Sequence, residues 1–173
     1  MKYLDTAFAQ LSFAWKLYHY ALDGRISLDD LDQPLVIESE DRRFVLATLP
    51  DKIFHGANDM VHAFTNNVTI AYGAAAITLN RCREEQKIDL ADPIVTAQDQ
   101  WAAVIYQVRN AFAHDIAEPR WNIIRPRYAR LYDLGDFQID LTNLRTKPFE
   151  YADLGGPDVL YWLKSYGEER GWI

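Results

Sequence analysis

The stretch NDMVHAFTNNVTIAYGAAAITLNRCREEQ, residues 58–86, decides the fold class of this chain. It contains no proline and a single glycine, and its apolar residues recur at spacings of three and four. That periodicity predicts one long, mostly buried helix. Gly73 and the alanines around it would let a second helix approach closely, so we expect a helical bundle.

Helices are also predicted on both sides of this stretch. Residues 3–23 carry one apolar stripe and are followed by Gly24, a residue typical of helix ends. Thr96 is a suitable N-cap for another helix whose apolar face runs from Trp101 to Phe112. Residues 34–54 hold two apolar blocks around a charged, turn-like segment, which could be a hairpin or a packed loop.

The last third of the chain has a different character. The segments YARLYDL and FQIDL, joined through Gly135 and Asp136, predict a short antiparallel hairpin. Gly155-Gly156-Pro157 should introduce a final helix that reaches about Glu169, with the proline in its first turn. We therefore expect an α+β, mainly α, single domain over residues 1–173. Its antiparallel bundle core spans about 57–116 plus helix 3–23, and 119–173 appends the hairpin and last helix.

Composition narrows the range of functions. The 173 residues are 49% hydrophobic, enough for one core, and a net charge of -7 argues against coating nucleic acid by bulk electrostatics. A single cysteine, Cys82, permits no intramolecular disulfide, which fits a reducing compartment. We find no apolar run long enough to cross a membrane and no signal peptide, so a cytoplasmic protein is expected.

The segment VRNAFAHD, residues 108–115, carries the chemistry. Arg109 is a permanent cation that can clamp a phosphate, and His114 carries an imidazole, the side chain that most often transfers protons in catalysis. RNA supplies its own nucleophile in the 2'-hydroxyl, so cleavage requires proton transfer and stabilisation of charge on phosphorus. His114 suits the first task and Arg109 the second, while Asn110 would orient the histidine or a phosphate oxygen.

Helix geometry complicates this assignment. Asn110 and His114 are four residues apart and point nearly the same way, whereas Arg109 is about 140° from His114 around a helix axis. Either the helix loosens near His114 and the arginine wraps round, or two copies of the helix pool their residues across a two-fold axis. The second arrangement predicts a homodimer with a composite cleft.

These residues resemble the signature of the HEPN family. Its members carry an arginine, a polar residue directly after it, and a histidine four to six residues further on, late in a bundle helix; Arg109, Asn110 and His114 match. The resemblance covers mainly residues 57–116 and implies a dimeric, metal-independent endoribonuclease of toxin-antitoxin or other defence systems. Ile116 stands where one toxin subgroup has a tyrosine, which argues against regulation by modification there and against a nucleotidyltransferase antitoxin.

Other residues invite functional readings with plain alternatives. Four arginines follow the motif with no acidic residue among them. They could bind the phosphates of an RNA strand whose bases stack on Trp121 and Tyr128. Alternatively, the arginines form the solvent-exposed face of a hairpin whose aromatic residues lie in the core. We assign RNA contacts to Arg120, Arg125 and Arg127 (the fourth is Arg130). His55, Asp59 and His62 could ligate a metal, but they fall at a helix start, so we expect no metal or cofactor.

The leading hypothesis is a metal-independent endoribonuclease with His114, Arg109 and Asn110 as its catalytic residues. RNA would be its substrate, a second copy its partner, and an antitoxin a further partner. Two alternatives stay open: a noncatalytic module that uses the same cleft to bind a nucleotide, RNA or protein, and a purely structural dimer.

Overall fold

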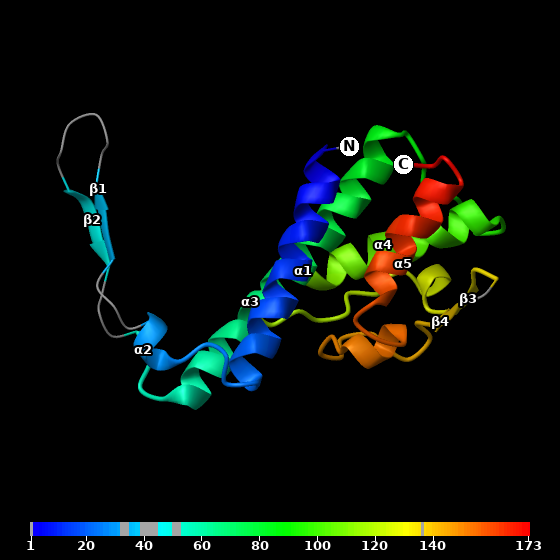
Figure 1. The fold of residues 1–173 in the computed structure, drawn as a ribbon. Helices are drawn as coiled ribbons and strands as arrows, with labels where there is room; N and C mark the ends of the chain where they lie inside the picture. The colour runs from blue at the N-terminus through cyan, green and yellow to red at the C-terminus, as the bar shows by residue number, and fades with distance from the viewer. Residues whose placement is uncertain (1, 32–34, 39–44, 50–52, 136) are drawn as a thin grey trace. The chain divides into compact units, whose positions relative to one another are not determined.

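The computed structural model describes residues 2–31, 35–38, 45–49, 53–135 and 137–173 (Figure 1). The chain is α+β and mainly helical, as the sequence predicted. It divides into two compact units: Ser12–Val68 form one, and Met1–Leu11 with Thr69–Ile173 form the other. Helices α1 (Lys2–Leu22) and α3 (Ala57–Glu85) contribute residues to both units. The assignment of a single domain stays a prediction.

The unit Ser12–Val68 holds the end of α1, the short helix α2 (Leu28–Leu31), two strands and the start of α3. Helix α1 stops where Gly24 adopts a φ of 65°, in the left-handed region that favours glycine at helix ends. Strands β1 (Leu35–Glu38) and β2 (Val45–Leu49) pair antiparallel, with Leu35 opposite Leu49. The strand alternative is therefore confirmed for these residues, and the rest of 34–52 lies outside the described residues.

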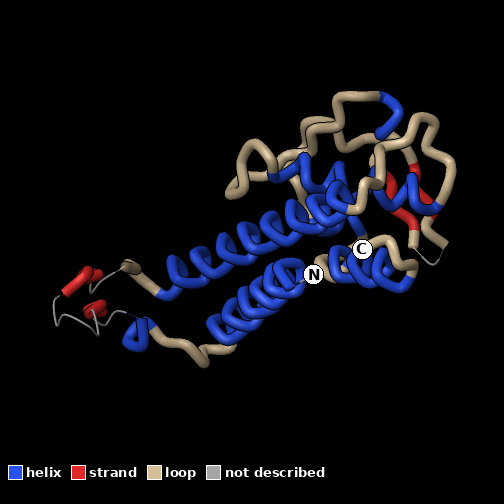
Figure 2. The backbone as a smooth tube through the Cα atoms, turned by 90° about the horizontal axis from the view of Figure 1, so that it is seen from above, coloured by secondary structure: helices blue, strands red, loops and turns tan. Residues whose placement is uncertain are grey.

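The larger unit is built on a helical bundle, visible from above in Figure 2. The start of α1, the second half of α3, α4 (Ala97–Phe112) and α5 (Val159–Glu169) surround one core. Helices α1 and α5 run antiparallel, since Asp5 pairs with Lys164 and Phe8 contacts Tyr161. The side chains that are almost fully buried come from all four helices: Leu4, Leu11, Tyr72, Leu79, Trp101, Ile105, Val108, Leu160 and Leu163.

The small residues of α3 allow the close helix approach that the sequence predicted. A Cβ atom added to Gly73 would lie 2.6 Å from Phe112 Cδ1 and 2.9 Å from Ile116 Cγ1. Ring contact between Tyr72 and Phe112, with centroids 5.7 Å apart, continues the same seam. The end of α4 is thus fixed against the middle of α3.

Helix α4 begins at the predicted N-cap. The Thr96 hydroxyl accepts a hydrogen bond from the Asp99 N–H at 3.1 Å, and the Asp99 carboxylate accepts one from the Thr96 N–H at 2.8 Å. This reciprocal pair satisfies two N–H groups that have no partner inside the helix. The backbone N–H of Thr96 is also the main reason why the pKa of Asp99 lies below its ordinary value.

The predicted hairpin and last helix are both present. Strands β3 (Leu131–Asp133) and β4 (Gln138–Asp140) pair antiparallel, between two 3₁₀ turns, η1 (Pro126–Tyr128) and η2 (Tyr151–Leu154). The expectation that Pro157 occupies the first turn of α5 is wrong, because the left-handed Gly155 and Gly156 extend the turn and Asp158 is the N-cap. Within the described chain, none of the helices has the length and apolar composition needed to cross a bilayer.

Candidate active site

Helix α4 ends inside the motif. Arg109 and Asn110 lie in its last turn, the helix stops at Phe112, and His114 lies two residues further on. Arg109 Nη1 donates a hydrogen bond to Asn110 Oδ1 at 3.0 Å, so the arginine side chain folds toward its neighbour. The arrangement matches the expectation that the helix loosens near His114 and that the Arg109 side chain wraps round it.

A single cavity of about 460 Å³ collects the three motif residues. Arg109 and Asn110 are half-buried at its wall, and His114 is exposed. Arg125, one of the arginines assigned to RNA contact, lines the same cavity. Its remaining lining comes from Tyr106, Gln107, Asn122, Ile124 and Tyr128. One chain therefore brings the whole predicted triplet to one hollow, which the geometry of an unbroken helix did not allow.

Asn122 is a site residue that the sequence reasoning missed. Its Nδ2 lies 3.1 Å from His114 Nε2, within hydrogen-bonding distance. Which of the two side chains donates depends on the tautomer of the imidazole ring. The contact joins residues eight positions apart across a loop, so no helical spacing could have indicated it.

The loop between His114 and Asn122 is held by backbone hydrogen bonds. Asp115 Oδ1 accepts from the N–H groups of Ala117 at 2.9 Å and Glu118 at 3.0 Å. These two donors, that of Glu118 first, hold the pKa of Asp115 below its usual range. The Arg120 N–H then donates to the Ala111 carbonyl oxygen at 3.0 Å, which closes the loop against the end of α4. This closure places the Asn122 side chain next to that of His114.

An aromatic pair forms another wall of the cavity. The rings of Tyr106 and Tyr128 have centroids 5.8 Å apart. The Tyr128 hydroxyl accepts a hydrogen bond from Arg127 Nη2 at 2.7 Å, and Arg127 Nη1 pairs with Asp92 at 2.8 Å. Tyr106 was also missed, although its position four residues before Asn110 places both on one row of α4. The role of Arg127 in RNA binding stays a prediction, and its contacts give it a structural role.

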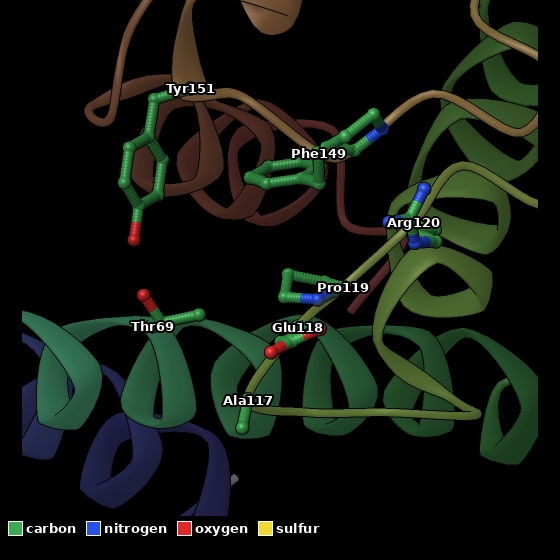
Figure 3. A pocket seen from close by; sticks show the side chains of 8 residues that line it. Thr69, Ala117, Glu118, Pro119, Arg120, Phe149 and Tyr151 are labelled. Carbon is green, nitrogen blue, oxygen red and sulfur yellow. The ribbon is translucent and has the colours of Figure 1, made fainter.

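Arg120 lies beside two further hollows. One, of about 340 Å³, shares His114 and Asn122 with the motif cavity and also contains Asp115 and Glu118. The other, of about 300 Å³, is drawn in Figure 3, where Arg120 stands at one end and Tyr151 faces Thr69 across the other. Arg120 is thus next to the motif cavity without lining it, whereas Arg125 lines it.

The rings interleaved with the arginines are not available for stacking. Trp121 and Tyr128 are 1% and 3% exposed, and Trp121 Nε1 donates to Asp153 Oδ2 at 2.7 Å. Arg120, Arg125 and Arg130 are exposed. Trp121 and Tyr128 thus enter the core, as the alternative expected, but Arg120, Arg125 and Arg127 precede the hairpin, and Arg127 is half-buried.

The residues His55, Asp59 and His62 mark a helix start. The Asp59 carboxylate accepts a hydrogen bond from the His55 N–H at 3.1 Å, just before α3 begins. No group of three histidine, cysteine or acidic side chains placed to hold a metal ion occurs among the described residues.

No family model matches this chain, and neither the curated proteins nor the solved structures contain a match to it.

Proposed function

We propose that this protein is a metal-independent endoribonuclease that resembles the HEPN family. The observation that supports this most directly is the cavity of about 460 Å³ that Arg109, Asn110 and His114 line together in one chain. This cavity is lined by a phosphate clamp, a neutral orienting amide and a proton-transfer group. The resemblance of the same three residues to the family motif is the second support.

The proposed reaction uses these side chains, the RNA and solvent water. A base at the site takes the proton of the 2'-hydroxyl, and the 2'-oxygen attacks the adjacent phosphorus. The bond from phosphorus to the 5'-oxygen of the next nucleotide breaks, and that oxygen receives a proton. The products are a 2',3'-cyclic phosphate and a 5'-hydroxyl. Arg109 stabilises the added negative charge on the phosphate. His114 transfers one of the two protons, and a solvent water transfers the other.

The test is cleavage of RNA by the purified chain in the presence of a chelator. We expect products with cyclic phosphate ends, and loss of at least about a hundredfold in rate for Arg109→Ala and His114→Ala, as is typical for removal of such groups. Arg145→Ala and His62→Ala are matched controls, because both residues are exposed and neither lines the cavity. Their rates should equal that of the unsubstituted chain.

Two results would refute this function. Cleavage that disappears on adding a chelator would indicate a metal-dependent reaction. Binding of RNA without cleavage, unchanged in Arg109→Ala and His114→Ala, would favour the noncatalytic binding module instead.

We also propose that the protein is a homodimer in which the motif of each chain faces the second copy. Sedimentation equilibrium would measure it, and co-purification with the product of an adjacent gene would test for an antitoxin partner.

A further inference from the structure

We infer that the substrate strand is unpaired at the site and that one of its bases stacks against Tyr106 inside the motif cavity. This inference rests on the proposed function, and it names the form of RNA that the site would accept. It requires an aromatic face beside the cavity, cations for the adjoining phosphates, and polar groups for the base edge. Each of these is present.

The Tyr106 ring is held by a neighbouring ring that lines the same cavity. Tyr106 is half-buried and its ring packs against Tyr128, which is itself 3% exposed. Arg127 fixes Tyr128 twice, by its hydrogen bond to the hydroxyl and by placing its guanidinium carbon 4.7 Å from the ring centroid. Arg127 is in turn held by Asp92. A base entering the cavity would therefore meet a ring that is already fixed in place, which lowers the entropy lost on binding.

The charges favour the motif cavity over its neighbour for phosphate. Arg109 and Arg125 both line it, and none of the described residues around it is acidic. The adjoining hollow beyond His114 has Arg120 but also Asp115 and Glu118. A polyanion crossing His114 is thus attracted mainly on the Tyr106 side.

A buried amide supplies a polar contact for the base edge. Gln107 lines the motif cavity and is 1% exposed, and its Oε1 has no hydrogen-bond partner in the described part of the chain. Buried polar atoms without a partner are uncommon in folded proteins. The N–H edge of a base seated on Tyr106 is a donor that would satisfy this oxygen.

Stacking of this kind selects unpaired RNA. In a duplex both faces of each base are covered by neighbouring bases, and the edges are engaged in pairing. Proteins that stack bases on aromatic side chains therefore act on single strands, loops and bulges. A cavity of about 460 Å³ also falls in the size range of small-molecule sites, which suits a single nucleotide better than a base pair.

The test uses oligonucleotides with 2'-O-methyl riboses, which bind without being cleaved. Fluorescence anisotropy compares an unpaired strand with the same strand in a duplex. We expect the unpaired strand to bind more tightly, and Tyr106→Leu to weaken its binding by about tenfold, the size typical of losing one stacking ring. Tyr106→Phe keeps the ring and should bind like the unsubstituted chain. Arg125→Gln should weaken binding and lower the slope of log affinity against log salt by about one.

A 2-aminopurine in the strand provides a second measurement. Its fluorescence should change on binding the unsubstituted chain and Tyr106→Phe but not Tyr106→Leu. Thermal unfolding of each variant confirms that the fold persists, since Tyr106 also packs on Tyr128. Equal affinity for duplex and unpaired strands, or full affinity and an unaltered fluorescence change in Tyr106→Leu, would overturn the inference.

These outcomes separate the inference from the proposed function. Binding that depends on Tyr106 without cleavage of unmodified RNA would refute the nuclease and keep the unpaired-strand site. Cleavage that depends on Arg109 and His114, together with RNA binding that does not change in Tyr106→Leu, would support the nuclease and refute the unpaired-strand site.

Discussion

Replacing Gly73 by alanine should destabilise the protein measurably. The new Cβ would lie 2.6 Å from Phe112 Cδ1 and 2.9 Å from Ile116 Cγ1, both closer than carbon atoms approach in folded proteins. Overpacking of this kind costs about 1–3 kcal/mol, and alanine recovers roughly 0.5–1 kcal/mol because it favours helix over glycine. Taking the middle of each range, we expect a net loss of about 1 kcal/mol in the free energy of unfolding.

Urea unfolding followed by circular dichroism measures this loss. For a chain of this length the melting temperature should fall by about 2–4 °C per kcal/mol. Gly56→Ala is the matched control, since a Cβ there meets no atom within 4 Å, and its effect should be within about 0.5 kcal/mol. Equal stability of Gly73→Ala and the unsubstituted chain would refute the close contact between α3 and the end of α4.

Four further predictions concern other parts of the fold. Asp99→Asn should make the chain less stable at neutral pH. Because folding lowers the pKa of Asp99, the difference in stability between the variant and the unsubstituted chain should be complete above the ordinary carboxyl pKa of about 3.9 and should shrink as the pH falls below it. Acid unfolding curves of both proteins measure this difference. Thr96→Ala should cost about 1 kcal/mol in urea unfolding through loss of the cap. Burial raises the pKa of the Cys82 thiol, so it should react with iodoacetamide only after the chain unfolds, as mass spectrometry would record. Trp121→Phe leaves the Asp153 carboxylate without its indole donor and should cost about 1–3 kcal/mol in thermal unfolding, whereas unchanged stability would count against that hydrogen bond.

Periodicity and caps explain why much of the fold was predictable. The apolar spacing of residues 58–86 and the hydroxyl of Thr96 act within a few residues, and α3 and α4 lie where these signals put them. The predicted place of Pro157 in the first turn of α5 was wrong, because the helix begins only at Val159, after Gly155 and Gly156 have adopted positive φ values that the sequence does not specify.

The candidate site was predictable only in part. Arg109, Asn110 and His114 were found because they are close in sequence, but their convergence depends on the helix ending at Phe112, which spacing does not specify. The partner of His114 could not be found, since Asn122 reaches it through a loop closed by a tertiary backbone contact. Tyr106 could have been found by extending the row of Asn110 and His114 one helical step backwards.

The hydrogen bond from the Arg120 N–H to the Ala111 carbonyl makes loop length a determinant of the site. This hydrogen bond closes a loop that contains His114, and Asn122 follows two residues after the closing residue Arg120. Ala117 and Glu118 enter this loop through their backbone N–H groups, so we expect changes of their side chains to have little effect on the histidine, whereas Ile116 also lies against Gly73. Loop length matters more, because an inserted or deleted residue has to be accommodated between Ala111 and Arg120 if Asn122 is to stay beside His114.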